Sequence, residues 1–401
     1  MSILLIEMEV GGHHMTSYTR SIVSNLIKNK KKIILLTSHE IKKKEFYLYF
    51  KQNTTIFYEK KIKYPTIKSQ INFFKFQLNY YNLVKKTFEK IYKKNKIEHV
   101  YINNLDFLDK PLSVYGSPFK NVNFSGLYLN PKFYMSFNIF SINFIKKIIY
   151  EKLFLRLLHL KDLKNLFFVD PLCFSYLNKI KKKYQKKISF INDLGTANQI
   201  KKNDMSKKKC QKFLNIEKNN FVILVYGSIR ENKSLNELIK VTALLKKDHK
   251  IKIIIAGSQD KETRFFLKRK ILSIKPVSKN FIIIDQYISD GMEKIIFKAA
   301  DVTWLGYSKK FYGSSGVFFL SCQNKVPVIG SNHGVLGWYL KKFNVGFSTD
   351  LLNTKSVITI LRKLIIKPNK LKYNFVEVNK KHNFQNFGKS IVQKILKKPL
   401  S

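Results

Sequence analysis

The chain has 401 residues, and its 75 Lys and Arg against 26 Asp and Glu give a formal net charge of +49 at pH 7. A hydrophobic content of 45% is typical of a globular protein and excludes a disordered polybasic tail, and the length favours two domains. No apolar run approaches the length that a membrane span needs, which is about 18 residues. The three cysteines, Cys173, Cys210 and Cys322, are widely spaced, which argues against a disulfide framework and against a cysteine-rich metal site.

In the first half of the chain, buried strands alternate with helices. Apolar runs predict strands at Ser2–Ile6, Lys32–Thr37, His99–Ile102, Leu166–Val169 and Ile188–Ile191. Apolar residues at helical spacing predict helices at Met15–Lys28, Ile71–Lys94 and Asn143–Lys161. We expect the last of these helices to pack on the core, although its basic and apolar residues leave a position on a membrane surface open.

A second series of strands and helices follows a polar, Lys-rich stretch. Its predicted strands are 221–226, 250–256, 280–285, 301–305 and 326–330. Its predicted helices are 234–246, a helix after the second of these strands that ends at about 273, 290–299, 317–323, 355–366 and about 389–397. Such alternation is typical of parallel α/β domains. We therefore expect Rossmann-like domains at 1–195 and 219–375, a linker at 196–218, and a helical tail at 376–401 whose packing on the first domain stays open.

Three loops of the second half combine small residues with groups that suit an anion. Between Gly227 and Ser234, backbone amides and the side chains of Arg230 and Lys233 follow a strand, as expected of a diphosphate site. Ser314-Ser315-Gly316 opens a helix whose dipole adds positive charge. A third small-residue turn follows the strand that begins at Val326. Each loop alone is common in α/β proteins, so the prediction depends on their order and spacing.

From Phe221 to about Asp350 the chain resembles the GT-B glycosyltransferases, specifically the nucleotide-sugar-dependent family 4 type. The resemblance is carried by "YGSIRENKSL", "IIIAGS", "YISDGMEKIIFKAADVTWLGY" and "YGSSGVFFLSCQNKVPVIGSNHGVLG". It implies two doubly wound Rossmann-like domains that face a central cleft. It also implies that the donor diphosphate is bound by Gly227, Ser228, Arg230, Lys233, Ser314, Ser315 and Gly316.

The chain departs from the family pattern at several of these positions. Family members commonly carry a pair of glutamates separated by seven residues, and the corresponding positions here hold Tyr312 and Leu320. The Ser-Ser-Gly loop looks like a variant that some members have instead. An arginine that commonly follows the turn glycine is replaced by Ser228, for which Arg230 is the nearby substitute.

In the first half, "EMEVGGHHMTSYTRSIVSNL" resembles the family's Gly-Gly loop, which reaches the cleft beside the reacting sugar. The resemblance implies a catalytic role for His14 or His13 and sugar contacts from Gly11 and Gly12; a histidine that caps the next helix or is solvated is the alternative. Asn104 and Asp106 follow another strand, where they contact sugar hydroxyls or act as turn formers.

The predicted partners are a nucleotide-diphosphate sugar and a glycan or lipid-linked acceptor. No cofactor is expected, because the nucleotide sugar is a substrate and the chain has no Asp-x-Asp pair for a metal. Lys is scattered along the chain together with abundant Ile, Asn, Phe and Tyr, which is typical of an A/T-rich genome and argues against a nucleic-acid partner. The N-terminus lacks the pattern of a signal peptide, so we expect a cytoplasmic protein, with peripheral contact to anionic membrane left open.

The function that follows is transfer of a sugar from a nucleotide diphosphate to a hydroxyl acceptor, with retention at the anomeric carbon, in the synthesis of cell-surface polysaccharide or glycolipid. The missing glutamates keep a catalytically inactive binding or assembly subunit as the alternative. A nucleotide-sugar epimerase of the same fold is a further alternative.

Overall fold

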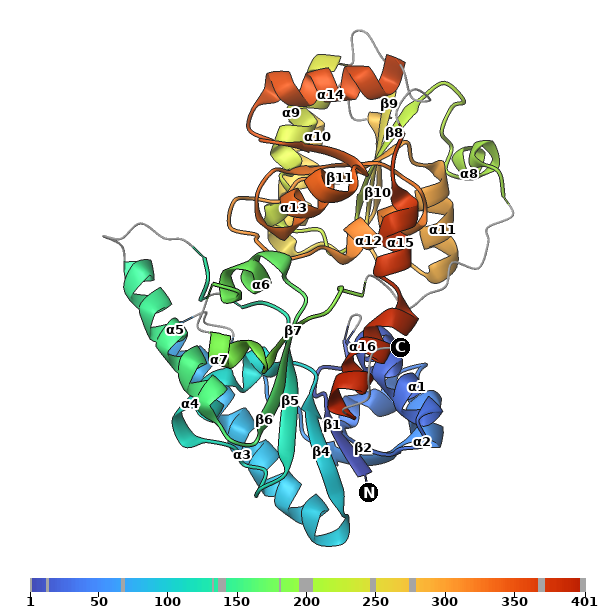
Figure 1. Ribbon diagram of the computed structural model, residues 1–401. Helices are drawn as coiled ribbons and strands as arrows, with labels where there is room; N and C mark the ends of the chain where they lie inside the picture. Colours follow the sequence, from blue (N-terminus) through green and yellow to red (C-terminus); the bar gives the residue numbers. More distant parts are fainter. Residues whose placement is uncertain are drawn as a thin grey trace. The chain divides into compact units, whose positions relative to one another are not determined.

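The computed structural model describes residues 2–11, 14–65, 69–131, 133–135, 142–179, 182–194, 205–245, 250–273, 279–366 and 372–396. The chain divides into two compact units (Figure 1). Unit 1 comprises Met1–Ala197 and Asn383–Ser401, and unit 2 comprises Asn198–His382. Each unit is built on one parallel sheet.

The sheet of unit 1 has the strand order β3-β2-β1-β4-β5-β6-β7, and every pair in it is parallel. Its strands are β1 Ser2–Ile6, β2 Lys32–Ser38, β3 Thr55–Glu59, β4 Ile97–Ile102, β5 Asn123–Tyr128, β6 Leu163–Phe168 and β7 Ile188–Phe190. Side chains of a strand alternate between the two faces of the sheet, so Ile3 and Leu5 of β1 enter one core cluster and Leu4 and Ile6 the other. The sheet is therefore buried on both faces.

Helices of unit 1 cover the two faces of this sheet. They are α1 Arg20–Lys28, α2 Tyr47–Asn53, α3 Gln70–Lys94, α4 Asp109–Tyr115, α5 Ile142–His159, α6 Pro171–Leu177, α7 Lys182–Gln185 and α16 Phe384–Ile395. Buried residues of α1, α2 and α16 join the cluster of Ile3 and Leu5, and those of α3, α4 and α5 join the other cluster. A π-helical turn, His14–Thr19, precedes α1.

The sheet of unit 2 has the order β10-β9-β8-β11-β12-β13 and is also parallel throughout. Its strands are β8 Phe221–Tyr226, β9 Ile251–Ala256, β10 Phe281–Ile284, β11 Val302–Leu305, β12 Val328–Ser331 and β13 Gly346–Thr349. The helices are α8 Lys207–Phe213, α9 Leu235–Leu245, α10 Lys261–Ser273, α11 Asp290–Ala299, α12 Gly316–Gln323, α13 Gly334–Phe343, α14 Thr354–Ile366 and α15 Phe375–Lys381.

Strand β8 shows why unit 2 is also doubly wound. Ile223 and Val225 pack in a cluster with α9, α10 and α14, whereas Val222 and Leu224 pack on the opposite face with α11 and α12. The predicted α/β class with two Rossmann-like parallel sheets is thus confirmed. Within the described residues, no helix is both long and apolar enough to cross a membrane.

The segments between and after the sheets differ from the predicted organisation. The range 196–218, expected to be a linker, contains α8, and Gln211 Nε2 of α8 donates a hydrogen bond to the Ala299 carbonyl of α11 at 3.2 Å. The range 376–401, expected to be one tail, is divided between the units. In α15, Asn379 Nδ2 bonds the Cys322 carbonyl in unit 2 at 3.1 Å, whereas α16 belongs to unit 1.

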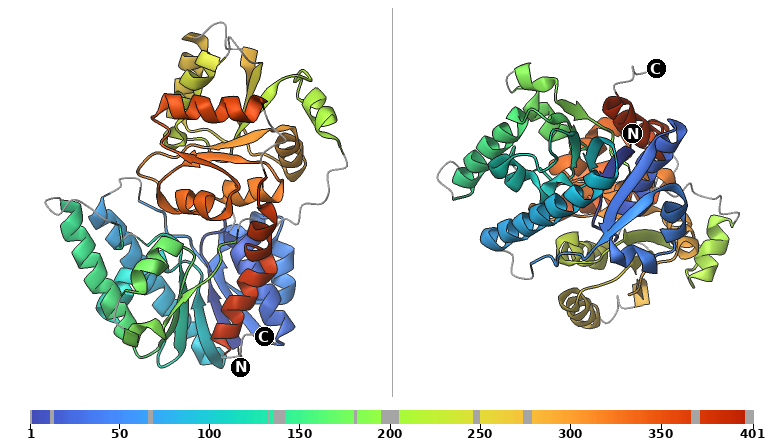
Figure 2. Two further views of the ribbon diagram at one scale, coloured as in Figure 1. Left: turned by 45° about the horizontal axis from the view of Figure 1, so that its top comes forward. Right: turned by 90° about the horizontal axis from the view of Figure 1, so that it is seen from below.

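Helix α16 lies against α1 although the two are far apart in sequence (Figure 2). Gly388 makes the close approach possible: a Cβ at this position would lie 2.4 Å from the Ser21 carbonyl oxygen and 2.5 Å from Asn25 Nδ2. Phe387 and Ile391 then enter the core cluster that contains Ile22 of α1. The close packing of α16 on α1 therefore requires glycine, which has no side chain, at position 388.

Gly388→Ala is expected to lower the thermal midpoint of unfolding, because the added methyl group pushes α16 away from α1. Overpacking of this kind costs roughly 1–3 kcal/mol, and about 2–4 °C per kcal/mol follows for a unit of this size. Gly291→Ala is the matched control, since a Cβ there meets nothing within 4 Å. Equal midpoints for both variants would show that α16 does not need this close contact.

Candidate functional site

In unit 2, the turn after β8 packs against the start of α12. Gly227 has φ +93°, which favours glycine, and a Cβ built on it would lie 3.3 Å from Val317 Cγ2. The turn after β9 approaches even more closely, because a Cβ on Gly257 would lie 1.9 Å from the Gly227 carbonyl oxygen. The structure therefore brings the predicted residues Gly227 and Gly316 to the same edge of the sheet.

Lys233 is buried behind this turn, with 4% of its surface exposed. Its Nζ donates hydrogen bonds to the Tyr226 carbonyl at 3.1 Å and to the Tyr307 hydroxyl at 3.0 Å, and it lies 4.7 Å from the centroid of the Tyr307 ring. An ammonium group has three N–H donors, so one remains beyond these two bonds. Among the described residues, Lys233 forms no ion pair. A buried cation without a carboxylate partner is costly, and an anionic ligand would compensate it.

Tyr307 links Lys233 to the Ser-Ser-Gly loop. The Tyr307 hydroxyl and Ser315 Oγ are 2.9 Å apart, and since Lys233 donates to the phenol oxygen, the phenol proton is available to Ser315. Ser315 is the N-cap residue of α12, and its side chain makes no capping hydrogen bond. Free amides at a helix N-terminus and the helix dipole favour an anion, and a Cβ on Gly316 would meet nothing within 4 Å.

The other predicted donor residues are placed differently. Ser228 is exposed. The Arg230 side chain is 59% exposed, and its Nη1 pairs with Asp260 Oδ2 at 3.3 Å. Leu320, at the position of a family glutamate, is buried in the core cluster that contains Leu224. Tyr312, at the other glutamate position, has its ring edge-on to the His333 ring at 6.0 Å.

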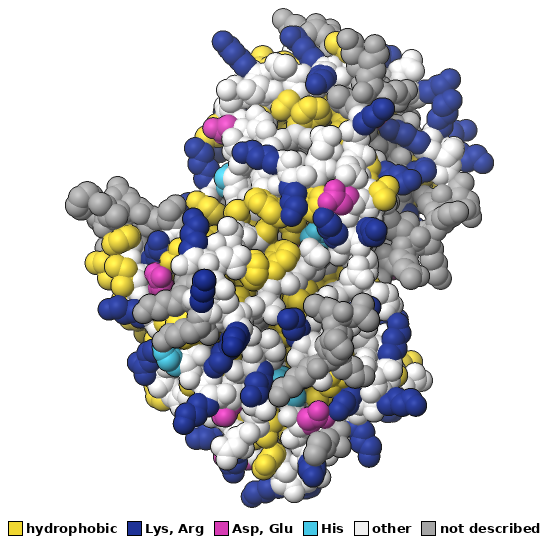
Figure 3. Space-filling view, viewed as in Figure 1, with side chains coloured by type: hydrophobic (Ala, Val, Ile, Leu, Met, Phe, Trp, Pro, Cys, Tyr) yellow, Lys and Arg dark blue, Asp and Glu magenta, His cyan; other side chains and the backbone are white. Residues whose placement is uncertain are grey.

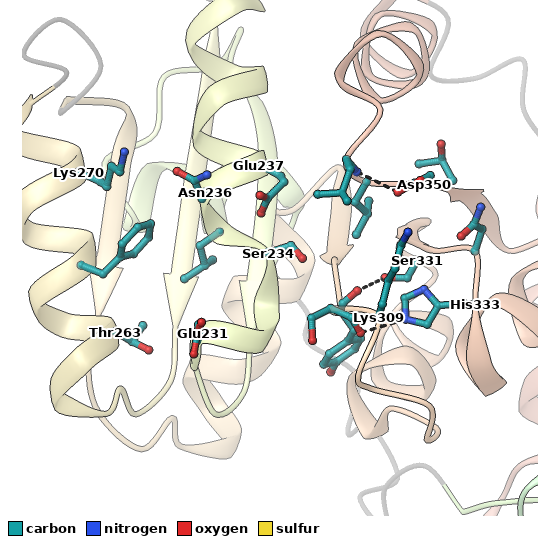
Figure 4. A pocket seen from close by; sticks show the side chains of 18 of the residues that line it. Glu231, Ser234, Asn236, Glu237, Thr263, Lys270, Lys309, Ser331, His333 and Asp350 are labelled. Atoms are coloured by element: carbon teal, nitrogen blue, oxygen red, sulfur yellow. Dashed lines mark hydrogen bonds between the residues drawn. The ribbon is translucent and has the colours of Figure 1, made fainter. Parts of the chain in front are cut away.

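A cavity of about 760 Å³ lies beside this network, within unit 2 (Figure 4). It collects residues that follow the carboxyl ends of β11, β12 and β13, together with the starts of α9 and α10. The strand order reverses at β8 and β11, and ligands of open parallel sheets bind at such a reversal. Tyr307 belongs both to the cavity wall and to the network of Lys233.

Two hydrogen bonds fix the wall of this cavity around Tyr307. Ser331 Oγ donates to the Tyr307 carbonyl at 2.6 Å, and His333 Nε2 lies 3.0 Å from the Ser308 carbonyl. In Figure 4, Ser331, Lys309 and His333 lie on one side of the space, opposite Glu231 and Ser234. Tyr307 was not predicted from the sequence, since a tyrosine two residues after a strand has no motif of its own.

In unit 1, the buried carboxylate of Glu7 organises the loop after β1. Glu7 is 1% exposed and accepts hydrogen bonds from Asn103 Nδ2 at 2.6 Å and from the Glu9 amide at 2.8 Å. Its Oε2 lies 3.3 Å from Nδ1 of His14. Glu7 was not predicted from the sequence, although an acidic residue directly after a buried strand was the available signal.

Glu7 also shifts the pKa of His14. Burial lowers the pKa of His14, but the hydrogen bond and the negative charge of Glu7, with smaller contributions from Glu9 and Asp106, outweigh burial and raise this pKa above its ordinary value. The Thr19 hydroxyl donates to the His14 carbonyl at 3.0 Å and holds the backbone of the π-helical turn. Glu7 therefore holds the ring of His14, and Thr19 holds its backbone.

A cavity of about 440 Å³ in unit 1 brings three predicted residues together: His14, Asn104 and Asp106 all line it. Asp106 accepts hydrogen bonds from the amides of Leu129 at 2.9 Å and Asn130 at 3.2 Å, and burial raises its pKa to about 6. The buried Oδ1 of Asn104 has no hydrogen-bond partner among the residues that the structure describes.

The remaining predicted residues of unit 1 lie elsewhere. The Gly11 amide faces Glu9 Oε1 at 3.3 Å, outside the cavity lining. Gly12 and His13 lie outside the described residues. Within the described ranges, no group of three His, Cys, Asp or Glu side chains is placed to hold a metal ion.

Two parallel Rossmann-like sheets in one chain define the GT-B class, and solved structures of that class match over nearly the whole chain. A glycosyltransferase from Rickettsia africae aligns with a TM-score of 0.66 and 15% identity, covering 99% of each chain. Alr3699/HepE from Anabaena in complex with UDP gives 0.71 and 12%, covering 99% and 100%. WaaG, a glycosyltransferase of lipopolysaccharide biosynthesis, gives 0.65 and 13%, covering 98% and 99%.

In the sequence of unit 2, residues 206–382 match the model of the family "glycosyl transferases group 1". Unit 2 thus matches the group 1 glycosyltransferases, and the chain as a whole has the GT-B fold, as the resemblance predicted. No curated protein matches the sequence. The assignment of Ser314-Ser315-Gly316 to a variant loop remains a prediction.

Glu7→Gln is expected to lower the pKa of His14, because it removes the largest contribution that raises this pKa while burial persists. A histidine titration followed by NMR measures it, with the exposed Glu45→Gln as control. The sign for stability follows from the raised pKa: protonated His14 stabilises unit 1 at low pH, and this contribution is lost as the pH rises through the folded-state pKa. An unchanged His14 titration in Glu7→Gln would contradict the assigned cause.

Proposed function

We propose that the protein transfers a sugar from a nucleoside-diphosphate donor to a hydroxyl group of a glycan or lipid-linked acceptor, with retention, in the synthesis of a cell-surface polysaccharide or glycolipid. The observation that carries the proposal is the buried ammonium of Lys233, which has no ion-pair partner among the described residues and is connected through Tyr307 to the N-terminus of α12. The UDP bound to the Anabaena protein supports this class of donor.

The chemistry of such a transfer requires stabilisation of the departing nucleoside diphosphate. As the bond from the anomeric carbon to the diphosphate breaks, negative charge accumulates on the departing oxygen. Fixed donors directed at this charge contribute more than mobile ones, because they need no reorganisation during the reaction. In this proposal the third N–H of Lys233 and the first amides of α12 bind the diphosphate, and the neighbouring cavity of unit 2 holds the rest of the donor.

Unit 1 contributes the acceptor side of the proposed reaction. The cavity that contains His14, Asn104 and Asp106 offers polar groups for sugar hydroxyls. His14, held by Glu7, is the proposed catalytic residue of this unit.

An inactive binding subunit is the second candidate. Two observations favour it: Leu320 is packed in the core, and Tyr312 replaces the other family glutamate. Such a subunit would bind a nucleoside diphosphate and release no sugar, whereas the enzyme transfers or slowly hydrolyses it. Release of nucleoside diphosphate from a panel of nucleotide sugars separates the two candidates.

Lys233→Met is expected to weaken binding of UDP at least tenfold, about 1.4 kcal/mol, because methionine keeps the volume and removes the charge. Isothermal titration with UDP, repeated with ADP, GDP and CDP to cover the base, measures the effect. Lys208→Met is the matched control, since Lys208 is exposed on α8. Equal affinities for the two variants would reject the proposed diphosphate site.

A further inference from the structure

The cavity of unit 1 has walls that suit a sugar ring. Aromatic side chains from several segments line it, among them Tyr64, Phe73, Phe107, Tyr128, Tyr150 and Phe154. The carboxylate of Asp106 and the unpartnered amide oxygen of Asn104 lie among them. Aromatic faces pack against apolar C–H groups, and carboxylate and amide oxygens accept hydrogen bonds from hydroxyl groups. A pyranose offers both kinds of surface.

An apolar stripe of α5 leads out of this cavity. Leu153 lines the cavity, and Ile149 and Ile145 follow it toward the N-terminus at intervals of four residues, which places all three on one side of the helix. Ile149 is 49% exposed and Ile145 is 59% exposed, and the adjacent Ile148 is 39% exposed. Figure 3 shows hydrophobic side chains at the surface on the side of the molecule where α5 lies.

The start of α3 continues the same apolar surface. Tyr64, which lines the cavity, is 55% exposed, and Ile71 in the first turn of α3 is 70% exposed. The Tyr150 hydroxyl of α5 donates a hydrogen bond to Gln70 Oε1 of α3, so the two helices meet at this edge. Lys110 Nζ confirms the proximity, lying 5.0 Å from the Phe73 ring centroid and 4.8 Å from that of Tyr150.

We call Tyr64, Ile71, Ile145, Ile148 and Ile149 the apolar rim. Single exposed hydrophobic residues are ordinary, but a contiguous set beside a cavity indicates a binding surface. The exposed Lys152 on α5 adds positive charge next to Ile148 and Ile149.

We infer that the acceptor is a sugar carried on an apolar chain, with the sugar in the cavity of unit 1 and the chain on the apolar rim. The continuity of the Leu153–Ile149–Ile145 stripe with the cavity wall is the argument for this single occupant. That this ligand is an acceptor rests on the proposed function; that the site binds a sugar with an apolar chain does not.

The test compares pairs of ligands that differ only in the apolar chain. Binding of octyl and methyl β-D-glucopyranoside, and of the corresponding galactosides, to the full chain is measured by isothermal titration below the micelle concentration of the octyl compounds. Each octyl glycoside is expected to bind at least tenfold more tightly than its methyl partner. Ile149→Asp and Ile71→Asp, both at exposed positions, are expected to remove this difference and to leave binding of the methyl glycosides unchanged.

Ile366→Asp is the matched control, because Ile366 is 64% exposed on α14 of unit 2; it is expected to retain the octyl preference. Equal affinities of octyl and methyl glycosides, or an octyl preference that survives in both rim variants, would overturn the inference. Sedimentation could also overturn the inference. If the wild-type chain forms a dimer that Ile149→Asp abolishes, the apolar rim is an interface between copies.

UDP titrations of the same proteins distinguish failure of this inference from failure of the proposed function. A wild-type chain that binds UDP but shows no octyl preference rejects only this inference, whereas a wild-type chain that binds no nucleoside diphosphate rejects the proposed function.

Discussion

The buried ammonium group of Lys233 is the centre of a hydrogen-bond network in unit 2. Lys233 follows the turn after β8, and its Nζ is enclosed by the Tyr226 carbonyl and the face and hydroxyl of Tyr307. Trp304 Nε1 donates to the Lys233 carbonyl at 3.1 Å and fixes the backbone as well. A cation buried in this way must be balanced, and the described residues supply no carboxylate for it. The geometry is explained if the balancing charge belongs to a ligand.

Unit 1 also contains a buried charged group, but one of the opposite sign. Glu7 is buried at the end of β1, and it is stabilised by the Asn103 amide, by a backbone amide and by His14. Both units therefore place a buried charged residue after the first strand of their sheet, where parallel strands end together and loops can converge. In unit 1 the carboxylate is hydrogen-bonded within the protein and holds His14 beside a cavity. In unit 2 the described residues leave the ammonium group without a carboxylate partner.

The sequence allowed prediction of those elements whose side chains have a strong local pattern. Strands such as β1 and β8 are continuous apolar runs because both faces of a parallel sheet are covered. Strand β13 was not predicted, since Gly346–Thr349 is short and carries no alternation, and β3 and β5 were missed for similar reasons. Helix α8 was predicted to be part of a linker because its sequence is rich in Lys. Only two of its residues, Cys210 and Gln211, are buried, which is too few for a visible helical pattern.

The candidate site was predictable only in part. The Gly and Lys residues of the loop after β8 could be identified because turn geometry and phosphate binding demand those residue types. Tyr307 and Glu7 could not be identified, because their roles depend on partners that the sequence does not indicate. Tyr307 is hydrogen-bonded to Ser315, and Glu7 is hydrogen-bonded to Asn103. The apolar rim is likewise invisible in the sequence, since the isoleucines of α5 look like core residues until their exposure is known.

A crystal structure of the chain with UDP tests the central claim most directly. Our account places the diphosphate oxygens within hydrogen-bonding distance of Lys233 Nζ and of the first amides of α12. Well-ordered UDP bound anywhere else, with Lys233 still enclosed by Tyr226 and Tyr307, would contradict it.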